Sequence, residues 1–172
     1  MAEVGALQSR TSGLRSHVAL VASALCVVAL ASAAVAGSAT RLPGFRSPSG
    51  NIRCLLIPAT RHTGYGRAPS ALLCQIAHAD YASKLQARCI GPSGRGVDWH
   101  GFLLTAAGKG GVNCSGGILY NPDTQRPSYV TPPYGRSWRQ GVSTCSSRST
   151  GVTCRNRAGH GVFVSRQTWR AW

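Results

Sequence analysis

The stretch over residues 52–57 is Ile52-Arg53-Cys54-Leu55-Leu56-Ile57, and the stretch over residues 71–76 is Ala71-Leu72-Leu73-Cys74-Gln75-Ile76. Each is an apolar run of strand length that contains one cysteine, and similar runs recur along the chain between turns rich in Gly and Pro. The later runs are 101–104, 112–114, 118–120, 142–145, 152–154 and 162–165. This spacing predicts an all-β fold, a small antiparallel domain, and residues 77–88 are the one stretch that suits a short helix.

Residues 1–36 have the composition of an export signal. Arg10, Arg15 and His17 precede an uninterrupted apolar run over 18–36, which ends in the small residues that a signal peptidase needs. As a helix this run would be about 28 Å long, close to the thickness of a bilayer core, so an uncleaved membrane anchor is the alternative. We predict a signal peptide over 1–36, a linker over 37–46 and a single β-domain over 47–172, secreted or held at the extracellular face of the cell envelope.

The cysteines of the exported part are even in number, which predicts disulfides. They are Cys54, Cys74, Cys89, Cys114, Cys145 and Cys154. Order along the chain favours the pairs Cys54–Cys74, Cys89–Cys114 and Cys145–Cys154, each linking neighbouring strands, although six thiols allow about 15 pairings. The chain has no Cys-x-x-Cys spacing and its histidines are isolated, so we expect neither zinc nor another cofactor.

The exported part is strongly basic. Without the two arginines and one glutamate of residues 1–36, it keeps 17 of the 19 basic and 3 of the 4 acidic side chains, a net charge of +14. Such a field attracts polyanions, among them phosphate-bearing wall polymers, anionic lipid headgroups and, without sequence specificity, nucleic acid. The alternative is a solvated surface that only keeps the protein soluble.

Two segments near the ends of the domain resemble each other. Residues 47–54 are Ser-Pro-Ser-Gly-Asn-Ile-Arg-Cys, and residues 147–154 are Ser-Arg-Ser-Thr-Gly-Val-Thr-Cys. Both place a Ser/Gly turn before a β-branched residue two positions ahead of a cysteine. This similarity suggests that the domain consists of two related halves, although short patterns also recur by chance.

The chain also resembles a family of small exported proteins of high-G+C Gram-positive bacteria, known as a domain of unknown function. The resemblance covers most of 45–172 and rests on four segments: 45–54, 98–99, 133–137, and 151–156 running into 159–166. It implies an exported, disulfide-bonded domain and brings no activity. The chain departs from the pattern at Gln75 and at Gly117-Ile118, where such proteins tend to have Asp or Glu and Asp-Thr.

Catalysis finds little support in the residue pattern. A glycosidase needs two neighbouring carboxylates, whereas Asp80, Asp98 and Asp123 lie in separate segments. Every cysteine of the exported part is assigned to a bridge, and no Gly-x-Ser-x-Gly motif occurs. A small basic nuclease could use His100 and His160 with Lys109 for general acid–base chemistry, so this class stays open as an alternative.

Binding has better support, because aromatic residues alternate with arginines over 120–172 and such pairs can stack sugars or bases while pairing phosphates. The candidate patch is Tyr134, Arg136, His160 and Arg166, chosen as polar residues in Gly-rich turns, which loops expose. We therefore expect a non-enzymatic envelope protein that binds an anionic surface polymer or partner. A disulfide-rich inhibitor or toxin, acting through the loop between Cys145 and Cys154, is a third class.

Overall fold

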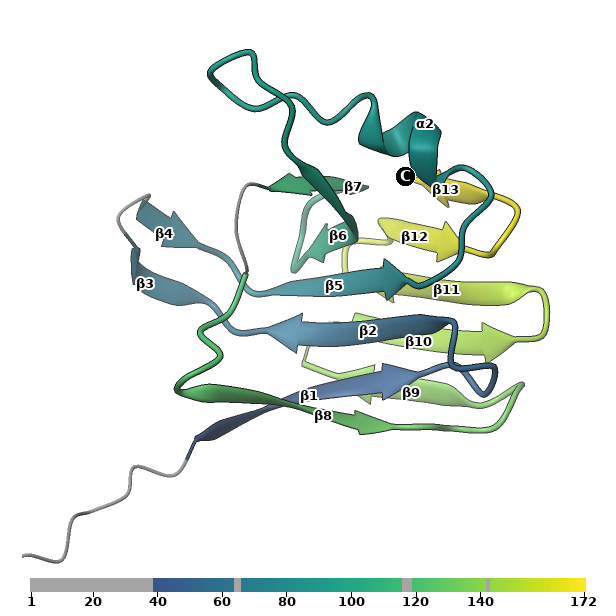
Figure 1. The fold of residues 1–172 in the computed structure, drawn as a ribbon. Helices are drawn as coiled ribbons and strands as arrows, with labels where there is room; N and C mark the ends of the chain where they lie inside the picture. The colour runs from purple at the N-terminus through teal and green to yellow at the C-terminus, as the bar shows by residue number, and fades with distance from the viewer. Residues whose placement is uncertain (1–38, 64–65, 116–118, 142) are drawn as a thin grey trace, which may run out of the picture. The chain divides into compact units, whose positions relative to one another are not determined.

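Two β-sheets face each other across a shared core in the computed structural model, which describes residues 39–63, 66–115, 119–141 and 143–172 (Figure 1). The six-stranded sheet has the order β7-β6-β5-β2-β1-β8, and the five-stranded sheet has the order β13-β12-β11-β10-β9. All neighbouring pairs are antiparallel except β1 and β8, which are parallel. The described residues form one compact unit, and the predicted all-β fold is confirmed.

The strand bounds are as follows. The six-stranded sheet consists of β1 (Thr40–Arg46), β2 (Ile52–Ile57), β5 (Ala71–Ile76), β6 (Asp98–Thr105), β7 (Gly110–Ser115) and β8 (Gln125–Val130). The five-stranded sheet consists of β9 (Ser137–Gln140), β10 (Ser143–Arg148), β11 (Gly151–Asn156), β12 (Gly161–Val164) and β13 (Trp169–Ala171). A separate hairpin pairs β3 (Thr60–Thr63) with β4 (Gly66–Ala68), and the helix α2 (Ala82–Gln86) lies inside the stretch predicted as helical.

The predicted linker over 37–46 is wrong for residues 40–46, which form β1 between β2 and β8. Pro43 makes this strand hard to recognise in the sequence, because proline has no N–H to donate to a neighbouring strand. The pairing with β2 begins only after Pro43, at Gly44. A side chain at Gly44 would meet the carbonyl oxygen of Cys54 at 2.6 Å and the ring of Tyr129 at 2.9 Å. Glycine there lets the Tyr129 ring lie on the strand.

Residues 1–36, predicted as a signal peptide or anchor, lie outside the described ranges. Within those ranges, no helix is long and apolar enough to cross a membrane.

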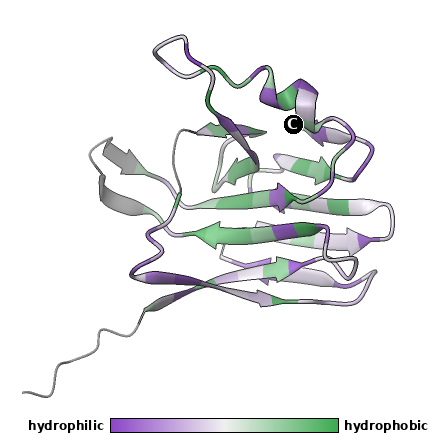
Figure 2. Ribbon diagram, viewed as in Figure 1, coloured by the Kyte–Doolittle hydropathy of each residue, from purple (hydrophilic) through white to green (hydrophobic). Residues whose placement is uncertain are grey.

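The core between the sheets takes its apolar residues from β1, β2, β5 and β6 of one sheet and from β10, β11 and β12 of the other. Hydrophobic residues are concentrated in β2 and β5 (Figure 2). Alternate residues of these strands face β10, β11 and β12, where Val152, Val162 and Val164 are about 1% exposed. Phe45 and Phe102 fill the space between the sheets against Trp138 and Trp169.

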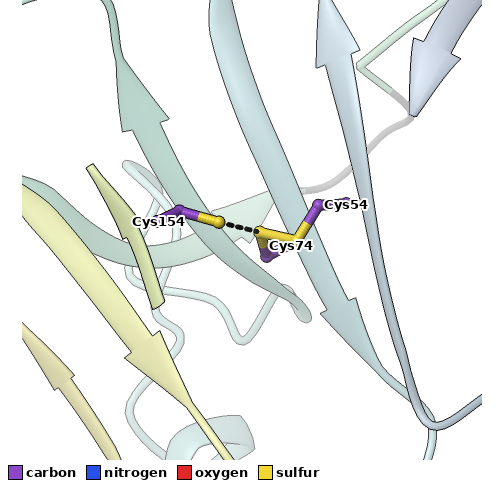
Figure 3. A group of neighbouring side chains, drawn as sticks. All are labelled: Cys54, Cys74 and Cys154. Atoms are coloured by element: carbon purple, nitrogen blue, oxygen red, sulfur yellow. Dashed lines mark hydrogen bonds between the residues drawn. A yellow bond between two sulfur atoms is a disulfide. The ribbon is translucent and has the colours of Figure 1, made fainter. Parts of the chain in front are cut away.

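The structure contains the three disulfides that order along the chain predicts. Cys54 and Cys74 lie directly opposite each other on β2 and β5, and Cys145 and Cys154 lie opposite each other on β10 and β11. The sulfurs of Cys74 and Cys154 are 3.9 Å apart, so the two bridges pack against each other where the sheets meet (Figure 3). The third bridge, Cys89–Cys114, links the segment after α2 to β7.

The two similar segments occupy partly equivalent places. Residues 47–51 join β1 to β2, and residues 149–150 join β10 to β11, so each is the turn of an antiparallel hairpin. The equivalence ends at the disulfide, because Cys54 bonds forward to β5 whereas Cys154 bonds back to β10. The suggestion of two related halves therefore remains an interpretation.

Candidate functional site

Turns from both sheets meet at one end of the domain and enclose a cleft of ≈ 770 Å³. It is lined by residues 47, 49–52, 77–78, 134, 148–152 and 165–167, and we call this set the cleft. The hairpin turns β1–β2 and β10–β11 and the turn after β12 lie at the same end of the two sheets (Figure 1). Each of these turns supplies one wall of the cleft. The cleft thus exists only because the two sheets pack with these turns at the same end.

The β1–β2 turn is fixed by its own side chains. The Ser47 hydroxyl accepts a hydrogen bond from the backbone N–H of Ile52 at 3.1 Å and lies 3.0 Å from the hydroxyl of Ser49. Gly50 has a φ of 75°, a conformation that suits glycine. The turn therefore holds its hydroxyls at the cleft without help from a ligand.

Asn51 ties this turn to the segment that follows β5. Its side-chain amide donates to the carbonyl of His78 at 3.1 Å, and its side-chain oxygen accepts the backbone N–H of His78 at 2.8 Å. Ala77 donates its backbone N–H to the carbonyl of Asn51 at 2.9 Å. These three bonds fix the β1–β2 turn to residues 77–78, which also line the cleft.

Tyr81 holds the turn after β12, which is the third wall of the cleft, through a hydrogen bond. Its hydroxyl donates to the carbonyl of Ser165 at 3.0 Å, and the Ser165 hydroxyl in turn donates to the carbonyl of Thr168. The Tyr81 ring lies in the core beside Trp99 and Phe102. This burial raises the pKa of the Tyr81 phenol to about 12, so the group stays a neutral hydrogen-bond donor over the physiological range.

The charges at the cleft are cationic. Arg148 and Arg166 line it, and the residues that line it include no Asp or Glu. Arg166 donates to Asp80, which lies outside the cleft, at 3.2 Å, but both side chains are more than half exposed, so water screens the pair and it holds little energy. The cleft therefore combines hydroxyl and amide groups with guanidinium groups that a ligand can reach.

The structure brings together three of the four residues predicted as a patch. Tyr134 and Arg166 line the cleft. Arg136 lies beside it, because its carbonyl accepts the N–H of Ser147, the neighbour of Arg148. His160 lies apart from these three residues, in the turn between β11 and β12, at the other end of β12 and about 16 Å away along the strand.

The histidine pair of the nuclease alternative is not brought together. His160 donates its N–H to Asn156, whose amide donates to the carbonyl of Thr105 at one end of β6. His100 lies five residues earlier on β6, about 16 Å away along the strand, and its ring contacts the carbonyl of Ser115. One histidine cannot act as base and the other as acid on the same bond at this separation.

Three buried sulfurs, those of Cys54, Cys74 and Cys154, lie within 4.8 Å of one another (Figure 3). Such a cluster could hold a metal ion as thiolates, but all three sulfurs belong to disulfides. The cluster is therefore a packing contact between two bridges.

Sequence reasoning missed several residues of the cleft. Arg148, His78 and Asn51 line it, and none of them was a candidate. One signal in the sequence could have found the cleft, namely the similarity of residues 47–54 to residues 147–154. Both turns lie at this end of the domain.

Comparison with known proteins gives a family and no function. Residues 21–170 match a family described as a Family of unknown function (DUF6636). No curated protein and no solved structure matches the chain.

Proposed function

We infer the function of this chain, which belongs to the family of unknown function DUF6636, from its own residues: the domain binds a phosphate-bearing glycan in the cleft. One observation carries this inference. The cleft combines hydroxyl, amide and guanidinium groups and includes no carboxylate among its lining residues. Sugar hydroxyls pair with the first two kinds of group, and phosphate pairs with guanidinium.

The size and rigidity of the cleft support a binding role. Its volume falls within the range of about 300–1,000 Å³ that is common for ligand sites. Its walls are held by Ser47, Asn51 and Tyr81 through hydrogen bonds that need no ligand. A site that is already ordered loses less entropy when it binds.

Tyr134 supplies an aromatic surface at the cleft. It is 45% exposed, although large apolar side chains in this domain are mostly buried. An exposed ring next to hydroxyl and guanidinium groups suits the flat apolar face of a sugar. We expect this ring to stack on the bound unit.

An extracellular location of the domain would agree with a phosphate-bearing glycan as its ligand. Its three disulfides are typical of an oxidising, extracellular environment. We propose that the protein is secreted or stays at the cell envelope, where phosphate-bearing glycans would be available to it. Because His100 and His160 lie apart, binding is favoured over acid–base catalysis by that pair.

The test is titration calorimetry of the oxidised domain with mannose 6-phosphate, a sugar phosphate of suitable size. Arg148→Gln should weaken binding about tenfold, the value of one charged hydrogen bond. Tyr134→Ala should weaken it by a smaller factor. The matched control is Arg95→Gln, because Arg95 is also exposed but lies in the loop before β6. Equal losses from Arg148→Gln and Arg95→Gln would contradict a cleft site, since they would indicate a diffuse charge effect.

A further inference from the structure

The outer face of the five-stranded sheet carries a continuous polar and basic surface. The core-facing residues Cys145, Cys154 and Val162 are about 1% exposed or less, so their strand neighbours point to the opposite side. These outward residues are all exposed or half-buried. We call them the open face: Ser137, Arg139, Thr144, Ser146, Thr153, Arg155, Phe163, Arg170 and Trp172.

The charge of this surface has one sign. The segment 137–172, which forms the whole sheet, contains no Asp or Glu. Its arginines are Arg139, Arg148, Arg155, Arg157, Arg166 and Arg170. On the open face, Arg139 lies on β9 and Arg155 on β11, two strands away, so their backbones are about 10 Å apart. The face therefore presents separate cationic points.

Two aromatic rings lie close against the backbone of this sheet. A side chain at Gly161 would meet the Trp172 ring at 2.5 Å, and one at Gly151 would meet the Phe163 ring at 2.9 Å. The guanidinium groups of Arg155 and Arg170 each lie 5.1 Å from the Trp172 ring. The Trp172 indole also donates to the carbonyl of Gly159 at 3.0 Å. Glycines thus let the rings rest on the sheet, where arginines flank one of them.

The open face leads into the cleft. Gly151, which the Phe163 ring covers, is also a cleft residue, and Arg148 pairs with it at the end of the β10–β11 hairpin. A chain that has one unit in the cleft can therefore continue over Phe163 and across the strands.

We propose that the open face binds the further units of the same phosphate-bearing glycan whose first unit lies in the cleft; this proposal rests on the proposed function. The arginines would pair with successive phosphates, and Trp172 and Phe163 would lie under sugar rings. Hydroxyls on neighbouring strands, from Thr144, Ser146 and Thr153, would pair with sugar hydroxyls. The ligand is therefore a polymer, and the domain contacts several of its repeats.

The composition of the face favours a glycan over a single-stranded nucleic acid. Nucleic-acid platforms stack successive bases on aromatic side chains. Here Phe163 lies on β12 and Trp172 directly follows β13, and four of the nine residues of the face carry hydroxyls. Hydroxyl-rich surfaces match the many hydroxyls of a sugar chain.

The experiment compares a long ligand with a short one. The probes are a phosphomannan, whose sugars are linked through phosphodiesters, and mannose 6-phosphate, each titrated into the oxidised domain at several salt concentrations. The test variant is Arg139→Gln/Arg155→Gln/Arg170→Gln. The matched control is Arg41→Gln/Arg88→Gln/Arg95→Gln, which removes the same charge from exposed positions outside the five-stranded sheet. Near-ultraviolet circular dichroism checks that both variants keep the native fold.

The proposal predicts that the test variant loses about tenfold in affinity for phosphomannan and keeps its affinity for mannose 6-phosphate. The slope of log affinity against log salt should fall by about 2 in the test variant. Equal losses of phosphomannan affinity in the two variants, with mannose 6-phosphate still bound, would overturn the proposed binding role of the open face. The proposed binding role of the cleft would not be affected. Failure of both probes to bind the native domain would overturn the proposed function itself. Tighter binding of a single-stranded oligonucleotide through the same arginines would overturn the choice of a glycan.

Discussion

The two sheets of this domain have opposite outer faces. On the six-stranded sheet, Leu42, Leu55, Ile57 and Leu73 point outward and are at most 7% exposed, because Leu119, Tyr120 and Tyr129 pack on them. We call these four leucine and isoleucine residues the covered face. On the five-stranded sheet, the corresponding positions hold mostly Arg, Thr and Ser, together with Phe163 and Trp172, and are exposed or half-buried.

The difference has a topological cause. The connection from β7 to β8 joins opposite edges of the six-stranded sheet, and Leu119 and Tyr120 in this connection pack on its outer side. The five-stranded sheet is a simple meander, and among the described residues its short turns leave the outer side uncovered. Each sheet has one cross-strand disulfide at its centre, so this feature does not distinguish them, whereas their covering does. The surface left free is the one available for binding.

The largest expected effect comes from placing the same charge on each outer face. Leu73 and Thr153 each precede a central cysteine and point outward. Leu73→Asp buries an unpaired carboxylate and should lower the free energy of unfolding by more than about 4 kcal/mol. Thr153→Asp should lower it by about 1 kcal/mol or less. Urea denaturation of both variants measures this, and similar losses would mean that the two faces do not differ in burial.

The disulfides test whether the sheets share one core. Cys145→Ala/Cys154→Ala opens a loop with a sequence separation of 9, and Cys54→Ala/Cys74→Ala opens one of 20. Each double variant should lose about 3 kcal/mol on the chain-entropy account. Because the bridges pack against each other, unfolding should remain a single transition in calorimetry. Two separate transitions would show that the sheets unfold independently.

Alkaline pH should loosen the wall of the cleft through Tyr81. Its pKa is raised to about 12, so the folded state keeps the phenol proton that the unfolded state releases near pH 10. This contribution to stability is complete below pH 10 and is lost as the pH rises to about 12, by roughly 1.4 kcal/mol per pH unit. Denaturation at several pH values measures it, with Tyr81→Phe as the control. If Tyr81→Phe shows the same alkaline loss as the native domain, another group is responsible.

Trp172 should give the smallest effect and the most local one. Trp172→Leu removes the ring that is flanked by Arg155 and Arg170 and that would lie under a sugar. It should weaken phosphomannan binding about threefold to fivefold, the contribution of one aromatic contact. Its binding of mannose 6-phosphate should not change. The control is Tyr120→Leu, in the segment that packs on the outer side of the six-stranded sheet, which should leave both affinities as they are. A loss for the short probe would show that Trp172 acts on the cleft.

The sequence predicted the central strands well and the outer ones poorly. The apolar runs at 52–57 and 71–76 became β2 and β5 because strands buried on both sides need apolar residues at nearly every position. The strands β1 and β8 were missed since each contains a proline. The run at 118–120 was expected to be a strand, but residues 119–120 form an irregular segment whose side chains cover the sheet. An apolar run in a sequence can therefore be an irregular segment that packs on a sheet and need not be one of its strands.

The candidate site was predicted in part for a similar reason. Exposed turns rich in glycine were predicted to carry the binding residues, and two residues of the predicted patch, Tyr134 and Arg166, line the cleft. His160 lies in an equally suitable turn, but successive turns of a meander fall at alternate ends of the sheet. Composition cannot show which end a turn occupies. The outward arginines were visible in the sequence, whereas their common face depends on strand register.

The most direct test of the central claim is an amide NMR titration of the oxidised, isotope-labelled domain with phosphomannan. We predict that the signals which shift belong to the cleft and to the open face, including Thr144, Thr153, Arg155 and Trp172. The signals of Leu55 and Leu73 on the covered face should stay in place. Shifts centred on the six-stranded sheet, or small shifts spread evenly over all exposed arginines, would contradict the account.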